Sequence, residues 1–143
     1  MSEENKAVAR RFFEIFSEGN VDALDEILAA DAQDHDPYNP HADEGVEGAK
    51  KTITMYREAF PDISFEIEFQ LAEGDMVATR WTGTGTHQGP LMGVEPSGNK
   101  STTTGIGIDR IEDGKIVESW NSWDTLGLMQ AIGAIPQAEG AQA

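Results

Sequence analysis

The hydrophobic pattern of this chain changes period once, close to residue 63. Before that point apolar side chains recur at helical spacing, as at Val8, Phe12 and Ile15. From Ile63 to Leu71 apolar and polar residues alternate, which is typical of a strand with one buried face. Helices followed by a run of strands are typical of α+β proteins, in which helices cover one face of a twisted sheet. The pattern therefore predicts an α+β fold with the helices first.

Local signals set the expected boundaries of these elements. Pro61 must end the last of the early helices, because proline cannot continue one. Asp113 and Gly114 predict a type I′ turn between two strands, and Asp124 can cap a short closing helix. Helices are expected over residues 3–17, 20–30 and 48–60 and after 124. Antiparallel strands are expected over residues 63–71, 76–86, 101–112 and 115–124.

Glycines indicate that the expected sheet is strongly curved. Gly83 and Gly85 interrupt one strand, which predicts a bulge or a bend there. Flat helix packing cannot fill a bent sheet, so we expect a cone-shaped α+β barrel with a pocket between the helices and the sheet. The segment 31–45, rich in Asp, Asn, His and Pro, is expected to cross the mouth of this pocket.

The two faces of the strand at 101–112 differ in bulk. Gly105 and Gly107 alternate with Ile106 and Ile108. If the glycine face lines the pocket, both isoleucines point outward together with Trp120 and form an exposed apolar patch. We expect a homodimer through this convex face of the sheet. Burial of the patch by the C-terminal tail is the alternative.

Composition restricts the partners and the location. The formal net charge is −16, from 26 acidic and 10 basic residues, so nucleic acid and anionic membranes should be repelled. The 143 residues fit one domain, expected at 1–134, with a disordered tail at 135–143. There is no long apolar run, no leader pattern and no cysteine, so we expect a cytoplasmic protein. The acidic excess is also typical of proteins adapted to high salt, and that alternative stays open.

Several short motifs occur in a fixed order along the chain. They include NK at 5–6, RFF at 11–13, DHDP at 34–37, AFPD at 59–62, GTHQGPLMG at 85–93, RIEDGKIV at 110–117, WD at 123–124 and LMQAIG at 128–133. Their order and spacing over residues 3–134 resemble the SnoaL-like polyketide cyclases, often called ester cyclases. The resemblance implies a cone of the nuclear transport factor 2-like superfamily, usually dimeric. It also implies ring closure in a hydrophobic aromatic or polycyclic small molecule by intramolecular aldol condensation, without metal or cofactor.

Aldol chemistry needs a base that removes an α-proton and an acid that protonates the acceptor carbonyl. In the characterised cyclases an aspartate on the strand after the Asp-Gly hairpin has this role, and the resemblance places that position on Asn121. The histidine and glutamine that face the pocket in those cyclases fall on Gly107 and Gly105. An amide cannot exchange a proton as a carboxyl does. The matched positions therefore lack the titratable groups of the family.

Three residues remain as catalytic candidates, namely His35, His87 and Asn121. His35 lies between two aspartates, and a neighbouring carboxylate can make an imidazole a better base. The alternative is a solvated loop histidine. His87 keeps its place in the Gly-x-His-x-Gly loop of the family, where the alternative is a hydrogen bond that orients this loop. Asn121 can polarise a carbonyl group or hold a water molecule.

The expected pocket wall is mainly aromatic, as a planar ligand requires. It is predicted to comprise Phe16, Tyr56, Phe60, Trp81, Met92, Ser119, Trp123 and Asp124. Alternation from Asn121 places Val117 on the pocket face and Glu118 on the opposite face. His41 is expected at the surface. Because the three histidines lack the spacing of a metal site, no metal is predicted.

Three functions are compatible with these residues. The leading hypothesis is a cofactor-free cyclase, or a related proton-transfer enzyme, that acts on a conjugated carbonyl compound. The second is a non-catalytic protein that binds a small ligand, which the amide at Asn121 favours. The third is an epoxide hydrolase or dehydratase. It would need an aspartate beside an arginine or tyrosine in the pocket, for which Asp34, Asp109 and Tyr38 are candidates.

Overall fold

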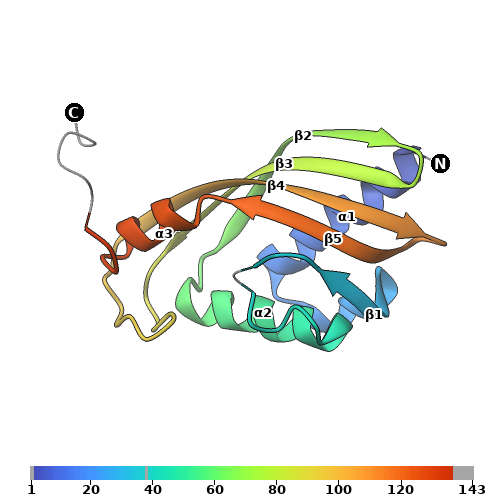
Figure 1. Ribbon diagram of the computed structural model, residues 1–143. Helices are drawn as coiled ribbons and strands as arrows, with labels where there is room; N and C mark the ends of the chain where they lie inside the picture. The colour runs from blue at the N-terminus through green and yellow to red at the C-terminus, as the bar shows by residue number, and fades with distance from the viewer. Residues whose placement is uncertain (1, 38, 137–143) are drawn as a thin grey trace.

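The computed structural model describes residues 2–37 and 39–136, arranged as helices packed on one curved sheet (Figure 1). The helical elements are α1 (Ser2–Glu18), the 3₁₀ helix η1 (Val21–Glu26), α2 (Gly45–Ala59) and α3 (Thr125–Ala131). The strands are β1 (Leu28–Asp34), β2 (Ser64–Glu73), β3 (Met76–Thr86), β4 (Lys100–Glu112) and β5 (Lys115–Trp123). Tyr38 lies outside the described residues, and so do residues 137–143 of the tail at 135–143 for which disorder is expected.

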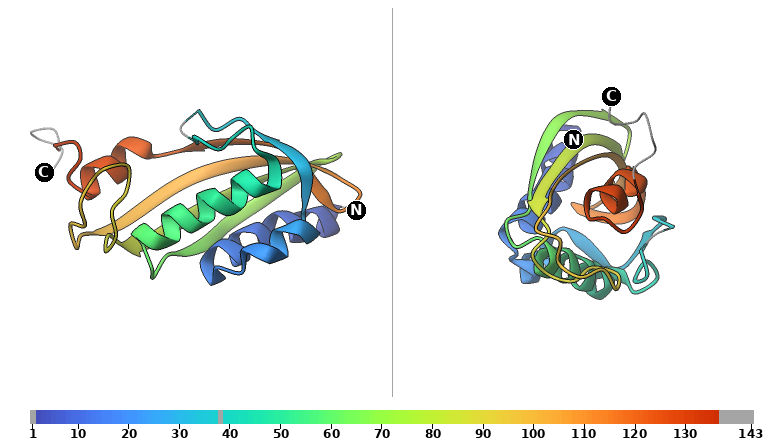
Figure 2. Two further views of the ribbon diagram at one scale, coloured as in Figure 1. Left: turned by 90° about the horizontal axis from the view of Figure 1, so that it is seen from below. Right: turned by 90° about the vertical axis from the view of Figure 1, so that its left-hand side faces the viewer.

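The sheet has the strand order β1-β5-β4-β3-β2. Strands β2 to β5 form an antiparallel meander, whereas β1 pairs with β5 in parallel. The edge strands β1 and β2 do not pair within the described residues, so the cone is not closed. Figure 2 shows α1 and α2 lying across the concave face. The predicted α+β fold is confirmed, but the prediction of a wholly antiparallel sheet is wrong, because β1 makes the sheet mixed.

The segment 20–30 differs most from its expected structure. It does not form a second α-helix but passes through η1 and enters β1. Leu28 aligns with Ile116 of β5, and both side chains are buried. The backbone amide of Ile116 donates a 2.7 Å hydrogen bond to the carbonyl of Ile27. This pairing with the sheet outweighs the helical spacing of the apolar residues, since tertiary contacts override local propensity.

Three local signals have the geometry that the sequence predicts. Asp113 and Gly114 have φ values of 52° and 77°, and a type I′ turn between β4 and β5 requires positive φ at both positions. Asp124 caps α3, because its Oδ1 accepts a 2.8 Å hydrogen bond from the amide of Gly127. Gly19, with φ of 83°, ends α1. Turn and cap chemistry is therefore the part of the fold that local sequence predicts best.

A β-bulge in β2 changes which side chains face the helices. The register shifts between Ile67 and Phe69. Phe69 and Leu71 consequently point outward and are 57% and 64% exposed, while Gln70 points inward and bonds to Thr79. The unbroken alternation predicted for this strand is therefore wrong beyond Ile67, because a bulge inserts one extra residue.

A second bulge, in β5, corrects the predicted face of Val117. From Ile116 to Glu118, β5 advances two residues while β4 advances one, so Val117 is the extra residue. Ile116 is 1% exposed and lines the cavity in the position predicted for Val117. Beyond the bulge the predicted alternation holds, with Ser119 in the cavity wall and Glu118 on the opposite face.

The apolar core has two parts. The larger part joins α1, η1, β1, α2 and the sheet, and its fully buried members are Ala9, Ile15, Leu24, Ile53 and Val77. The smaller part lies where α2, α3 and the loop between β3 and β4 meet, and consists of Ala59, Phe60, Leu91, Leu128 and Ile132. No helix in the described ranges is long and apolar enough to cross a membrane.

Candidate functional site

A cavity of about 190 Å³ lies between the helices and the concave face of the sheet. Its apolar wall is largely aromatic and includes Phe12, Phe13, Phe16, Tyr56, Phe60, Phe65, Trp81 and Trp123. Its polar side chains come from β1, the segment after β1, and the paired strands β4 and β5, and include Asp34, Asp36, Asn39, His41, Asp109, Ser119 and Asn121. An apolar cavity with a few converging polar groups is typical of small-molecule sites.

Glycines on the inner face of β4 leave room for this cavity and its aromatic wall. A Cβ atom at Gly105 would overlap the ring of Trp81 and lie 2.7 Å from Cβ of Trp123. A Cβ atom at Gly107 would lie 2.7 Å from Oδ1 of Asn121. The glycine face of this strand therefore points inward. The opposite face carries the two isoleucines of the strand and is exposed.

Asp109 is an inward-facing carboxyl next to these glycines. Its neighbour on β5 is Ser119, whose Oγ donates a 2.6 Å hydrogen bond to Asp109 Oδ1. Asp109 Oδ2 has no hydrogen-bonding partner among the described residues. Protein surrounds the side chain, and burial, opposed by the Ser119 bond and aided by the charge of Asp34, raises the pKa of Asp109 to about 6. A carboxyl that titrates close to neutral pH can both accept and return a proton.

Asn121 has a positioning role in this arrangement. Its Nδ2 donates a 3.3 Å hydrogen bond to Asp34 Oδ1. Asp34 also accepts bonds from Nδ2 of Asn39, over 2.8 Å, and from the backbone amide of Asp36, over 3.0 Å. These three donors hold the Asp34 carboxyl in the cavity wall, where its charge acts on Asp109. The amide at Asn121 therefore fixes a neighbouring carboxylate and exchanges no proton itself.

Tyr56 brings a hydroxyl group to the same cavity from α2. Its ring contacts the rings of Phe16 and Trp123, each with a centroid distance of 6.3 Å. The hydroxyl has no hydrogen-bonding partner among the described residues. Burial, aided by the charge of Asp36, raises the pKa of Tyr56 to about 12. The phenol stays protonated at neutral pH and can donate a hydrogen bond to a ligand.

Most residues expected in the pocket wall line the cavity. These are Phe16, Tyr56, Phe60, Trp81, Ser119, Asn121 and Trp123. Met92 does not line it, because it lies in the loop between β3 and β4 with positive φ (51°) and is 49% exposed. Asp124 does not line it either, since its carboxylate caps α3.

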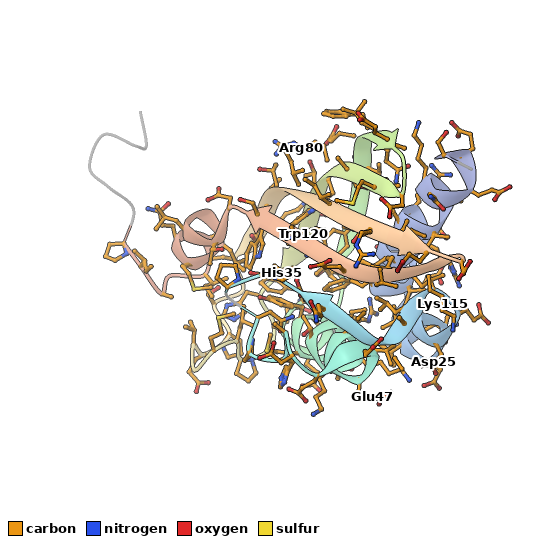
Figure 3. All side chains as sticks on the ribbon, turned by 45° about the vertical axis from the view of Figure 1, so that its right-hand side comes forward. Asp25, His35, Glu47, Arg80, Lys115 and Trp120 are labelled. Carbon is orange, nitrogen blue, oxygen red and sulfur yellow. The ribbon has the colours of Figure 1, made fainter. Side chains whose placement is uncertain are left out.

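His35 lies outside the cavity wall, although it was expected as a candidate base. It follows β1 and stacks on Trp120 of β5, with ring centroids 5.2 Å apart and planes inclined by 15°. Its Nε2 lies 2.7 Å from Oε2 of Glu118. Figure 3 shows His35 and Trp120 together at the outer side of the sheet. Hydrogen bonds from His35 and then Arg110 lower the pKa of Glu118. This group of residues is a solvent-facing ion pair and is separate from the cavity.

His87 is buried but does not line the cavity either. Its Nδ1 accepts a 3.1 Å hydrogen bond from the backbone amide of Ser97 and also lies 2.9 Å from Ser97 Oγ. Its backbone bonds to Asn99 and Gly98 on the far side of the same loop. Its ring packs against Phe60 at a centroid distance of 5.6 Å. These contacts fit the loop-orienting alternative, because they join the two ends of the loop between β3 and β4.

Two functional candidates follow from the structure more than from sequence reasoning. The sequence pattern suggests a catalytic role for Asp109 only in epoxide chemistry, although its odd number puts it on the glycine face of β4. That parity with Gly105 and Gly107 was the available signal. His41 was expected at the surface, yet it lines the cavity with its Nδ1 2.6 Å from Oε2 of Glu44. The segment around His41 has no periodicity from which its direction could be predicted.

Metal ligation finds no support in this region. Among the described residues, no three histidine, aspartate or glutamate side chains are arranged to hold a metal ion. The carboxyl group of Asp34 bonds to amide groups instead, and His41 pairs with a glutamate.

Comparison with known proteins finds similarity to one family model and to several solved structures. A family model described as SnoaL-like polyketide cyclase matches residues 6–132. No functionally curated protein is significantly similar to the chain in sequence. Among solved structures, TsrD from Streptomyces laurentii is 28% identical, with a TM-score of 0.83 over 93% of this chain and 97% of that one.

Two further solved structures have similar backbones but are named for different functions. A candidate SnoaL-like polyketide cyclase from Jannaschia sp. CCS1 is 28% identical, with a TM-score of 0.84 over 95% of this chain and 96% of that one. AclR from Streptomyces galilaeus, a candidate hydroxylase, is also 28% identical, with a TM-score of 0.83 over 96% of this chain and 86% of that one. The cavity residues therefore have to decide the chemistry, because the fold alone does not.

Proposed function

Because this chain belongs to the SnoaL-like polyketide cyclase family, we propose that its cavity catalyses proton transfer on a conjugated carbonyl compound without a cofactor. The specific reaction that we propose is an aldol-type ring closure within one substrate molecule. One observation carries the proposal: Asp109 lines a mainly apolar cavity, has a carboxyl oxygen without a hydrogen-bonding partner among the described residues, and has a pKa of about 6. Such a group matches the requirement for a general acid–base catalyst near neutral pH.

In the proposed reaction Asp109 acts first as the base. Its carboxylate removes a proton from the carbon next to one substrate carbonyl, and the electron pair of the broken C–H bond forms an enolate. The enolate carbon attacks the second carbonyl of the same molecule, which forms the ring bond and an alkoxide. Protonated Asp109 then returns its proton to the alkoxide, so the enzyme ends unchanged. Held in one cavity, the two reacting groups of the substrate meet without a separate binding step.

Tyr56 is the proposed donor for the developing negative charge. Tyr56 lines the same cavity, and its hydroxyl has no partner in the described part of the chain and stays protonated. A preorganised donor in a site of low polarity stabilises an enolate more than the ketone that precedes it. Asp109 therefore supplies the base that the matched position, Asn121, cannot supply, and Tyr56 supplies a hydrogen-bond donor.

The cavity volume supports a compact substrate. About 190 Å³ is less than the roughly 300–1,000 Å³ typical of sites for drug-sized ligands. An engineered cavity of about 150 Å³ in another protein binds benzene. We therefore propose an aromatic substrate of one or two rings, which is the small end of the aromatic or polycyclic class that the family resemblance implies.

The test is exchange of α-protons in D₂O, followed by NMR on a panel of one- and two-ring aromatic ketones. The wild-type protein should accelerate exchange for at least one ketone, and Asp109→Asn should remove that acceleration. Asp109→Glu, which keeps the carboxyl, should retain part of it. Equal acceleration by wild type and Asp109→Asn would contradict the proposed role of Asp109.

A second candidate function is ligand binding without chemistry. The observation that favours it is the amide of Asn121, which bonds to Asp34 and stands where the family resemblance implies an acid–base aspartate. Tight binding of a ketone without any exchange at its α-carbon would support this candidate over catalysis. The same panel therefore separates the two functions.

We also propose that a second copy of the chain covers the outer face of the sheet. Phe69, Leu71, Ile106 and Ile108 are 37–64% exposed there and lie on β2 and β4. An exposed apolar surface of this kind favours burial against a partner. Sedimentation equilibrium should detect a dimer, and Leu71→Glu should shift it toward monomer. Monomer alone at every concentration would contradict this proposal.

A further inference from the structure

The charged side chains in the cavity wall are mostly of one sign. Asp34, Asp36 and Asp109 line it, whereas no lysine or arginine does among the described residues. The single basic group in the described wall is His41, which is already paired with Glu44. A ligand in this cavity therefore meets carboxylates without meeting a free cation.

The contacts that the structure describes for Asp34 leave its charge uncompensated. Asp34 accepts bonds from two side-chain amides and one backbone amide, and Asp36 accepts a 3.0 Å bond from Nε1 of Trp123. These donors are dipoles and carry no net charge. Asp109 in turn leaves Oδ2 without a hydrogen-bonding partner in residues 2–37 and 39–136, although protein surrounds the side chain and it faces the cavity. That unpaired oxygen is an acceptor aimed at a ligand.

The aromatic side chains of the cavity wall also favour a cation over an anion. Tyr56 and Trp123 meet edge to face, and the ring of Phe16 also packs against Tyr56. The faces of aromatic rings attract cations and repel anions, because their π electrons make the face negative. Trp123 contributes both to the aromatic wall and to the contacts of the carboxylates, since its ring lines the cavity and its N–H donates a hydrogen bond to Asp36.

We infer that the cavity selects its ligand by charge: it excludes carboxylates and phosphates, and it binds a protonated amine more tightly than a neutral ligand of the same shape. This inference rests on the proposed function for the location of the site, but it concerns binding and not proton transfer. A unit charge about 5 Å from one carboxylate, at the effective dielectric of a protein site, shifts binding by roughly 100-fold. A basic amine substituent on the proposed carbonyl substrate therefore favours its binding, and an acidic substituent opposes it.

The experiment compares three para-substituted acetophenones of nearly equal size. They carry an aminomethyl group (cation), a methyl group (neutral) or a carboxylate (anion). Affinities are measured by isothermal titration calorimetry and by NMR at pH 7. The amine should bind at least about tenfold more tightly than the methyl compound, and the carboxylate at least about tenfold more weakly. Equal affinities, tightest binding of the carboxylate, or no saturable binding of the amine would overturn the inference.

Two variants distinguish the effect of the cavity charge on ligand affinity from the effect of the net charge of the protein. Asp109→Asn removes one unit of negative charge inside the cavity and should reduce the preference for the amine. Glu66→Gln removes the same charge from an exposed position on β2 and should leave the order of affinities unchanged. If both variants have the same effect, the selection comes from the net charge of −16 and the inference is overturned.

The readouts distinguish failure of this inference from failure of the proposed function. Binding order reports only on charge selection, and α-proton exchange reports only on catalysis. Binding of the amine should also strengthen between pH 5 and 7 as Asp109 ionises. This dependence should be smaller in Asp109→Asn, where Asp34, Asp36 and His41 remain as the other charged or titratable side chains of the described wall. A pH-independent affinity in the wild type would contradict the contribution of Asp109 to charge selection.

Discussion

The inner and outer faces of the sheet place the same chemical group in opposite environments. On the inner face, burial raises the pKa of Asp109 to about 6. On the outer face, hydrogen bonds from His35 and Arg110 lower the pKa of Glu118. These two carboxyls lie on adjacent strands, where Asp109 pairs with Ser119 and Arg110 pairs with Glu118.

This difference teaches that a histidine beside a carboxylate is not sufficient evidence for a catalytic site. The pair of His35 and Glu118 has a catalytic appearance, but it faces solvent and its carboxylate is stabilised in the charged form. Asp109 has no histidine partner, yet its environment brings its titration close to neutral pH. Burial, and not proximity to a base, makes the inner group suitable for proton transfer.

The largest expected effect is loss of catalysis when the inner carboxyl is removed. Asp109→Asn should lower the rate of α-proton exchange by about 10²–10⁴-fold, the usual contribution of a general acid–base group. The measurement is the exchange rate of the best ketone of the panel, with binding measured in parallel. A decrease of less than about threefold would remove Asp109 from the proposed mechanism.

The next largest effect compares two isoleucines on opposite faces. Ile116→Ala should destabilise the protein by about 2–5 kcal/mol, because it leaves a cavity in the buried core. Ile108→Ala should cost about 1 kcal/mol or less, since Ile108 is 37% exposed while Ile116 is 1% exposed. Urea denaturation at low protein concentration, where any dimer dissociates, measures both. Equal costs would contradict the assigned faces.

A smaller effect is the pH dependence of stability. The pKa of Asp109 is about 6 in the folded chain and 3.8 in its ordinary state, so the folded chain binds more protons between these values. Stability due to Asp109 is therefore present at low pH and falls as the pH rises from 3.8 to 6, by at most about 3 kcal/mol. Asp109→Asn should be more stable than wild type at pH 7, and this gain should disappear near pH 4. Chemical denaturation at both pH values tests this, and a gain that is independent of pH would contradict the raised pKa.

The smallest effect is expected on the outer face. His35→Ala removes an exposed pair and should change the exchange rate by no more than about twofold, because such pairs contribute little and the cavity is untouched. The same assay on His35→Ala and Asp109→Asn gives the comparison directly. A loss of exchange in His35→Ala similar to that in Asp109→Asn would show that the outer face takes part in catalysis.

Much of the fold was predictable from local patterns. The period change near residue 63, the Asp113-Gly114 turn and the Asp124 cap all specify structure through neighbouring residues. The strand β1 was not predictable in this way, because its partner β5 lies far along the chain. The bulges in β2 and β5 also escaped prediction, since alternation contains no signal for one inserted residue.

The cavity was easier to predict than the groups that act in it. Aromatic residues such as Tyr56 and Trp123 were expected in its wall from their faces on the helix and strand. The raised pKa of Asp109 depends on burial under helices and on a charge from β1, neither of which the neighbouring residues encode. The family resemblance assigns the acid–base position to Asn121, which pairs with Gly107, whereas Asp109 lies two residues further along β4 and pairs with Ser119.

The central claim is that Asp109 is a carboxyl of raised pKa that faces the cavity, and NMR tests it without any substrate. Protein labelled with ¹³C at its aspartate carboxyl carbons is titrated from pH 3 to 8, and Asp109→Asn identifies the resonance of Asp109. The account predicts that this carboxyl titrates at a pH of about 6 in the wild type. Titration of the same resonance near the ordinary value of 3.8 would contradict the account.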